Sequence, residues 1–302
     1  MPNTCYKLVR FYITELESKN ETFSFLFLRE ENLKNNKMKI IEFREYGKGE
    51  MVTPIWSCLN NPDNNLKGYY RSVLNTPFNK KRFRRAGVFR NIEKIDDQKT
   101  FANFKGIRCL DMPIKMAGSM EYRVPKELEQ FLEPISKMIA FETSHNERMI
   151  DFYAYLTIDQ SETTGRETHR EAGLHVDGFQ GKRIEPKVEC DRSYIVFDCD
   201  CPSFWNQSFE TVENMDEGTQ NIFHEFDRTK HYSSEIKCVP FNIYFMDCYA
   251  VHSANKAENK RRTFCRLSFS VRQFDRLGNS HNHLFDYKWG MFTRDINSAL
   301  SN

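Results

Sequence analysis

The chain has 302 residues, which is enough for one large domain or for a domain with an N-terminal extension. Its 44 basic and 42 acidic residues leave a formal net charge of +2, so the overall charge does not argue for binding to nucleic acid or to membranes. The nine Cys lack the paired spacing of a secreted disulfide framework. Neither a signal-peptide core nor a run of about 20 apolar residues is present. These features predict a cytoplasmic protein without a membrane partner.

The first 120 residues are expected to form a β-rich extension. Three segments rich in β-branched and aromatic residues predict strands at 6–13, 23–28 and 39–43. Residues 57–79 carry Asn, Pro and Gly, which predicts a loop. We expect residues 1–120 to pack on a catalytic core of residues 121–302 as one compact unit.

The segment from Lys80 to Arg85 is a dense basic run that contains one aromatic residue, Phe83. This composition suits a phosphate-binding patch, although a solvated loop or helix face has the same composition and is more common. Residues 80–90 are therefore a candidate docking surface for nucleic acid.

Residues 125–142 predict the clearest helix. Pro125 suits the first helical position, and Pro134 predicts a kink inside the helix. The apolar residues recur at helical spacing; they are Leu128, Phe131, Leu132, Ile135, Met138 and Ile139.

After this helix the chain becomes rich in strands. Alternating or β-branched segments predict strands at 151–158, 193–199, 241–246 and 262–271, with a short helix near 216–226. Several strands with turns between them indicate a sandwich or jelly roll. The expected fold class is therefore α+β, mainly β.

His175-Val176-Asp177 is the first part of a candidate metal site. In an extended chain, residues i and i+2 point to the same side, so both side chains can reach one metal. His252 lies far along the chain, so only the fold can bring it close. Two imidazoles and one carboxylate suit Fe(II), Mn(II) or Zn(II) and leave coordination positions open. Each part of this pattern alone is weak, because a chain with eight His contains such pairs by chance.

The strand that follows His252 carries two arginines on one face. Side chains alternate along a strand, so Arg262, Arg266 and Ser268 point to the same side. Two inward-facing arginines are costly unless they meet an anion, and a carboxylate would meet that need.

The His-x-Asp pair, the distal His and Arg266-Leu267-Ser268 resemble the iron(II)/2-oxoglutarate-dependent dioxygenase superfamily, over residues 150–275. The resemblance implies a double-stranded β-helix, a jelly-roll variant, with flanking helices. It also implies that Fe(II), 2-oxoglutarate and O2 are the cofactors, with the metal held by His175, Asp177 and His252.

The resemblance leaves two candidates for the residue that holds the far carboxylate of 2-oxoglutarate. Arg262 and Arg266 lie 10 and 14 positions after His252, and the Arg-x-Ser form favours Arg266. The expected helpers are Ser268, Tyr153 and Tyr155.

The expected reaction is hydroxylation of a small polar molecule with release of succinate and CO2; desaturation or ring closure would use the same ligands. Candidate substrate contacts are His169, Arg170, Arg183 and Trp205. One alternative is the same chemistry on a nucleic acid or a protein side chain. Another is a non-catalytic jelly-roll binding or structural protein, in which the His and Asp residues are incidental.

Two other clusters, Cys199-Asp200-Cys201 and His281-Asn282-His283, contain metal-ligand residue types. Each lacks a partner pair at zinc-site spacing, so neither is expected to form a metal site.

Overall fold

The computed structural model of the chain describes residues 44–46, 50–52, 63–105, 108–162, 173–177, 190–216, 220–255 and 261–292. Contacts within the chain divide it into two units, Met1–Lys37 and Met38–Asn302, and every described residue belongs to the second unit. The strands expected at 6–13, 23–28 and 39–43 lie outside the described residues. The boundary expected at residue 120 stays a prediction.

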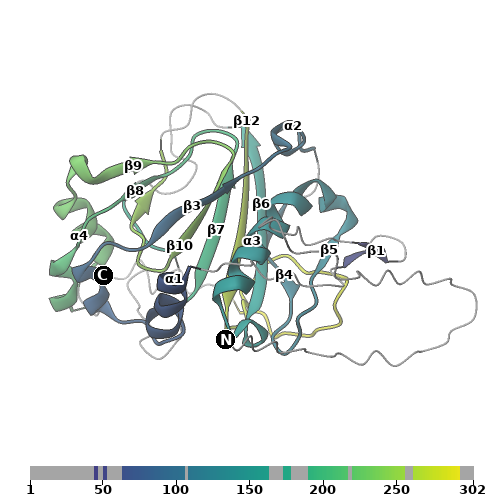
Figure 1. Ribbon diagram of the computed structural model, residues 1–302, viewed down its shortest axis with the longest axis horizontal. Coiled ribbons are helices and arrows are strands. Elements are labelled where there is room, and N and C mark those ends of the chain that lie inside the picture. Colours follow the sequence, from purple (N-terminus) through teal and green to yellow (C-terminus); the bar gives the residue numbers. More distant parts are fainter. Residues whose placement is uncertain are drawn as a thin grey trace, which may run out of the picture. The chain divides into compact units, whose positions relative to one another are not determined.

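The largest sheet has six antiparallel strands in the order β3-β10-β7-β12-β6-β4 (Figure 1). In that order the strands span Phe89–Lys94, Asn242–Asp247, Arg192–Phe197, Arg261–Ser270, Tyr153–Glu162 and Cys109–Lys115. The four central strands lie close to where the sequence pattern predicts them, so those predictions are confirmed. The two edge strands, β3 and β4, come from the segment before residue 120.

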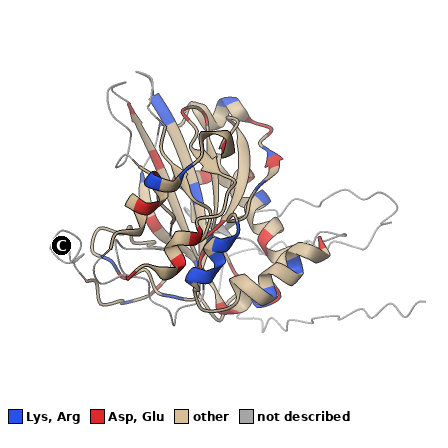
Figure 2. Cartoon of the chain, turned by 90° about the vertical axis from the view of Figure 1, so that its left-hand side faces the viewer, with Lys and Arg blue, Asp and Glu red and all other residues tan. Residues whose placement is uncertain are grey.

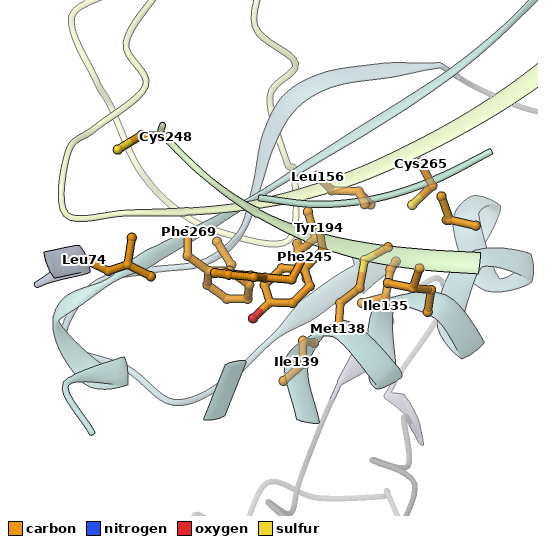
Figure 3. Close-up of a cluster of buried hydrophobic side chains, with 14 of the residues drawn as sticks. Leu74, Ile135, Met138, Ile139, Leu156, Tyr194, Phe245, Cys248, Cys265 and Phe269 are labelled. Atoms are coloured by element: carbon orange, nitrogen blue, oxygen red, sulfur yellow. The ribbon is translucent and has the colours of Figure 1, made fainter. Parts of the chain in front are cut away.

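One face of this sheet is covered by α3 (Leu132–His145), which follows the 3-10 helix η3 (Lys126–Phe131). The predicted apolar face lies against the sheet: Figure 3 shows Ile135, Met138 and Ile139 beside Tyr194 and Phe269. The chain from residue 126 to 131 is 3-10 rather than α-helical. Pro134 lies in the first turn of α3, where a missing N–H is tolerated. It therefore marks the start of the α-helix rather than a kink inside it.

The opposite face of the sheet packs on a second, smaller antiparallel sheet, β11-β8-β9. Its strands are β11 (His252–Ser253), β8 (Ser203–Trp205) and β9 (Glu235–Lys237). Phe204 of β8 stacks on Phe89 of β3 with 4.7 Å between ring centroids. Ile195, Phe197, Tyr244 and Met246 from the large sheet complete this inner apolar cluster. The second part of the candidate metal site, His252, therefore lies on the sheet that faces the inner side of the large one.

The prediction of a loop over residues 57–79 is wrong for its described part. α1 (Asn64–Tyr69) leads directly into the π-helix η1 (Tyr70–Leu74). The carboxylate of Asp63 caps the helix by accepting hydrogen bonds from the backbone N–H groups of Asn65 and Leu66. Leu66, Tyr70 and Leu74 are buried at four-residue spacing, a helical pattern that the Asn- and Gly-rich composition obscures.

The other elements are short. The helix expected near 216–226 is confirmed as α4, shifted toward the C-terminus. Within the described residues, no helix is long enough and apolar enough to span a bilayer. The helices are α2 (Gln98–Ala102), η2 (Lys80–Arg84), η4 (Met149–Asp151), η5 (Glu210–Asn214), α4 (Ile222–Thr229) and η6 (Tyr232–Ser234). A further antiparallel sheet has β1 (Arg44–Tyr46), β2 (Glu50–Val52) and β5 (Arg123–Pro125).

Candidate metal centre

His252 is placed by the turn that joins β10 to β11. The buried carboxylate of Asp247, at the end of β10, accepts hydrogen bonds from the backbone N–H groups of Tyr249 (2.9 Å) and Val88 (3.0 Å). After this turn, His252 pairs with Phe204 of β8, and the two rings stack with 5.1 Å between their centroids. The distal His therefore projects from an ordered strand rather than from a free loop.

His175 is fixed to His252 through the main chain. The backbone N–H of each residue donates to the carbonyl of the other at 2.9 Å, which forms an isolated antiparallel bridge. Gly173 precedes the bridge with a φ of +114°, a conformation that favours glycine. A Cβ at Gly173 would also lie 2.7 Å from the carboxylate of Asp227, which accepts a hydrogen bond from the N–H of Leu174. This local geometry holds the two imidazole rings with centroids 4.4 Å apart.

Both imidazoles have one nitrogen directed to a backbone carbonyl. His252 Nδ1 lies 2.9 Å from the carbonyl oxygen of Ala250, and His175 Nδ1 lies 3.3 Å from that of Gly173. When Nδ1 donates to a carbonyl, Nε2 carries the lone pair that binds a metal. The backbone contacts thus select the tautomer that a metal site needs.

Asp177 completes the donor set. Its Oδ1 lies 3.9 Å from His252 Nε2, and one ligand atom from each of His175, Asp177 and His252 lies within 4.8 Å of the other two. Among the described residues, this is the one group of three His, Cys, Asp or Glu side chains that converges in this way. Two imidazole nitrogens and one carboxylate oxygen form the donor set of an open Fe(II) site, so the residues present fit such a metal.

Arg266 lies beside this donor set and is held by two carboxylates. Its Nη1 lies 3.3 Å from Asp177 Oδ2, and its Nη2 lies 2.8 Å from Asp111 Oδ1. Burial alone would lower the pKa of Arg266, but the carboxylates of Asp111 and Asp177 raise it above its usual value. Arg266 is thus a charged guanidinium that already has two carboxylate partners, although its Nε is buried without a hydrogen-bond partner in the described part of the chain.

Arg262 lies four residues earlier on the same face of β12 and has different surroundings. Its guanidinium packs over the rings of Phe197 (4.4 Å) and Phe264 (6.0 Å). Its side chain is buried, and in the described part of the chain its Nε has no hydrogen-bond partner. Burial lowers the pKa of Arg262 below its usual value. The carboxylates of Asp198 and Asp200 act in the opposite direction and raise this pKa, but neither forms an ion pair with Arg262 among the described residues. A buried cation without an ion pair is the kind of group that an anionic ligand stabilises.

The three expected helpers of the cosubstrate lie on the same face of the large sheet as the arginines. The hydroxyl of Ser268 lies 2.8 Å from that of Ser193 on β7. Tyr155 donates to the carbonyl of Arg272 at 2.8 Å and its ring stacks on Phe274. The hydroxyl of Tyr153 accepts a hydrogen bond from Gln273, also in the segment after β12. Both tyrosines therefore bind the segment that follows β12.

The four expected substrate contacts are not brought together by the described structure. His169, Arg170 and Arg183 lie outside the described residues. Trp205, on β8, is 5% exposed and belongs to the buried core. The residue that the sequence pattern missed is Asp111, because nothing local links it to the metal motif. Its position inside the apolar segment 109–114 is the one signal that would have singled it out.

The basic run at Lys80–Arg85 folds against the protein itself. Lys80 Nζ donates to the carbonyl of Met215 at 2.8 Å, Arg82 packs over Tyr69 and Tyr249, and Arg84 pairs with Glu213. Figure 2 shows that Lys and Arg are interspersed with Asp and Glu over the described chain. Nucleic-acid docking on this run stays a prediction.

Solved structures of other proteins are similar to this chain over most of its length, at low sequence identity. No family model and no curated protein matches the chain. The similar solved structures include a 2OG-Fe(II) oxygenase family oxidoreductase from Burkholderia pseudomallei (10% identity, 76% of this chain and 97% of that chain, TM-score 0.36). AviO1 from Streptomyces viridochromogenes is 13% identical over 63% of this chain and 92% of its own, with a TM-score of 0.37. EvdO2 from Micromonospora carbonacea var. aurantiaca, complexed with 2-oxoglutarate, is 10% identical over 70% and 92%, with a TM-score of 0.35. At such low TM-scores these similarities do not by themselves assign a fold or an activity.

Proposed function

We propose that the protein is an Fe(II)/2-oxoglutarate-dependent dioxygenase that hydroxylates a small polar molecule and releases succinate and CO2. The observation that carries the proposal is the convergence of His175, Asp177 and His252, with both Nδ1 atoms directed to backbone carbonyls. The two antiparallel sheets that face each other across the inner apolar cluster are compatible with a double-stranded β-helix. Iron and 2-oxoglutarate, when bound, supply the activation of O2.

The chain's own residues have separate tasks in this proposal. His175, Asp177 and His252 hold the metal on one side and leave the other side open for cosubstrate and O2. The inner apolar cluster, with Phe204 stacked on His252, excludes water from that side of the site.

Arg262 is the proposed anchor for the far carboxylate of 2-oxoglutarate. The Arg-x-Ser form of the sequence favours Arg266, but Arg266 is already paired with Asp111 and Asp177. Arg262 is buried against two Phe rings and, among the described residues, has no ion pair, although Asp198 and Asp200 lie near enough to favour its charged form. A carboxylate would balance its charge and accept its N–H groups.

The first experiment tests the metal and the cosubstrate without knowledge of the substrate. Fe(II) and 2-oxoglutarate are added anaerobically to the purified apoprotein, and the visible charge-transfer band of an iron-bound keto acid is recorded. We expect the band in the parent and in His283→Ala, a change at an exposed histidine outside the site, but not in His175→Ala. A parent that binds neither iron nor 2-oxoglutarate would favour the alternative of a non-catalytic jelly-roll protein.

The same band, titrated with 2-oxoglutarate, distinguishes the two arginines. Loss of a buried charge pair costs about 2–5 kcal/mol, so Arg262→Ala should raise the Kd of 2-oxoglutarate about 30-fold or more. Arg266→Ala should act mainly on metal affinity. A large loss of 2-oxoglutarate affinity in Arg266→Ala alone would return the anchor to Arg266.

The substrate class is tested by succinate release in the presence of candidate compounds. Small polar molecules are the primary set. Single-stranded nucleic acid is the second, because the basic run at 80–85 retains Lys81 and Arg85 outside the contacts described above. Steep salt dependence of binding would support the nucleic-acid alternative.

A further inference from the structure

Asp111 lies in a distorted part of the edge strand β4. The pairing of β4 with β6 shifts between Cys109 and Met112, where β4 has one more residue than its partner. Such a bulge turns a side chain out of the regular alternation, and bulges are frequent beside functional sites. Asp111 also has a φ of +45°, in the left-handed region that costs free energy for a residue with a Cβ. The surrounding structure must stabilise this conformation.

The side chain of Asp111 is the first member of a chain of hydrogen bonds that ends at the metal ligands. Thr157 of β6 donates its hydroxyl proton to Asp111 Oδ1 and accepts from the backbone N–H of Asp111, both at 3.0 Å. Asp111 Oδ1 in turn accepts from Arg266 Nη2 at 2.8 Å. Arg266 Nη1 then reaches Asp177 Oδ2 at 3.3 Å.

The two oxygens of Asp177 thus have different neighbours. Oδ2 faces Arg266, whereas Oδ1 faces His252 Nε2 at 3.9 Å. An arginine that holds one carboxylate oxygen leaves the other as the single donor atom for a metal. Single-atom coordination by Asp177 keeps more positions open for a chelating keto acid.

Asp111 is well placed to fix the arginine in this task. The side chains of Asp111 and Arg266 are only 16% and 12% exposed, so their charges interact through protein more than through water. Without Asp111, Arg266 would keep a single carboxylate partner among the described residues, and its second amino group would lose its 2.8 Å bond. The guanidinium would then be free to swing toward Asp177 and to engage both of its oxygens.

We propose that Asp111 is a positioning residue of the metal centre, which acts through Arg266 to orient Asp177. This inference rests on the proposed function, since it requires that His175, Asp177 and His252 hold a metal. It assigns a role in the metal site to a strand that precedes the His-x-Asp motif by more than sixty residues (175 − 111 = 64).

The test uses Co(II) alone as the probe, so that neither O2 nor a substrate enters the measurement. The full chain is titrated with Co(II), and the visible d–d absorption is recorded up to saturation. Asp111→Asn removes the charge but keeps the shape, and Asn tolerates a positive φ as well as Asp does. We expect Co(II) affinity to fall about 10- to 100-fold and the d–d band of the saturated protein to change in position or intensity.

A second variant separates positioning from backbone strain. Asp111→Gly relieves the cost of the positive φ but deletes the carboxylate. It should be at least as stable as Asp111→Asn and should show the same altered Co(II) spectrum. Thr157→Val, which removes only the hydroxyl bonded to Asp111, should give a smaller change in the same direction.

The matched control is Asp191→Asn. Asp191 also pairs with an arginine near β12, Arg272, and its side chain is only 9% exposed, but neither residue belongs to the group of candidate ligands. This variant should lose stability and keep the parent's Co(II) affinity and spectrum. Parental affinity and spectrum in both Asp111 variants would overturn the positioning role and leave the proposed function intact. Absence of Co(II) binding in the parent, with a folded chain, would overturn both.

Discussion

The two arginines of β12 should respond to replacement with opposite changes in stability. Arg262 is 9% exposed and has no ion pair among the described residues. Removing a charge from water costs several kcal/mol, whereas its contacts with Phe197 and Phe264 return at most about 2 kcal/mol. Arg262→Leu should therefore leave the free energy of unfolding of the apoprotein unchanged or raise it by about 1–2 kcal/mol.

Arg266→Leu should have the opposite effect, because it leaves two carboxylates without their cation. Breaking a buried pair costs about 3–5 kcal/mol. Asp177 retains 23% exposure of its side chain and can be partly hydrated, so we expect about 2–4 kcal/mol.

Urea unfolding in EDTA, with neither metal nor 2-oxoglutarate present, measures both changes. Arg90→Leu is the control, because Arg90 and Asp63 form an exposed pair that should contribute less than about 1 kcal/mol. If Arg262→Leu destabilised the protein more than Arg266→Leu, the inference that the charge of Arg262 is poorly compensated in the apoprotein would be refuted.

Two further predictions concern buried charges outside the site. Burial lowers the pKa of Lys115 to about 7 in the folded protein. Between about pH 7 and 10 the unfolded chain therefore binds more protons than the folded one. The free energy of unfolding should then rise with pH over that range by up to about 5 kcal/mol. Lys115→Met should remove this contribution; parallel pH profiles of parent and variant in urea unfolding would contradict it. Glu142 accepts hydrogen bonds from Arg192, Tyr70 and Tyr194 in the fully buried core. Glu142→Ala should therefore lower the free energy of unfolding by about 3–5 kcal/mol, because it leaves the charge of Arg192 buried and unpaired. Adding Arg192→Met should recover part of that lost stability. Failure of the double variant to recover stability in the same assay would show that the hydroxyl contacts, not the charge, dominate.

The central strands were predictable because their signal is local. In β6 and β12, apolar side chains alternate with polar ones over most of the strand, and each strand pairs on both sides in the sheet. The same alternation predicted that Arg262, Arg266 and Ser268 lie on one face of β12. Arg266, on that face, contacts the candidate ligand Asp177. The three candidate ligands, which the structure brings together, were predicted from their residue types and spacing.

The remaining features depend on contacts between distant segments. β3 and β4 are edge strands. Because β3 carries the charged residues Arg90, Glu93 and Lys94, its sequence has no apolar alternation that would predict a strand. The contrast between Arg262 and Arg266 is likewise invisible in the sequence. It arises because Asp111, on the edge strand β4, reaches the guanidinium of Arg266 and not that of Arg262.

The site also depends on a backbone approach that only glycine permits. A Cβ at Gly87 would lie 2.2–2.3 Å from the backbone atoms of Tyr249 and Ala250, far inside van der Waals contact. The carbonyl of Ala250 is the group that lies 2.9 Å from His252 Nδ1, so a displaced backbone would change the orientation of the distal imidazole. Gly87→Ala should therefore lower both the free energy of unfolding and the Co(II) affinity.

Gly68→Ala is the matched control for this change. Gly68 lies in α1, and a Cβ there would meet nothing within 4 Å, so alanine should stabilise the helix by about 0.5–1 kcal/mol and leave Co(II) binding unchanged. Co(II) affinity is compared while all variants are folded, so each titration is done at a denaturant concentration well below the unfolding midpoint of that variant. If Gly87→Ala bound Co(II) as tightly as the parent, the Ala250 carbonyl would not control the imidazole. The orientation of His252 would then have to come from its main-chain bridge to His175 and its stacking on Phe204.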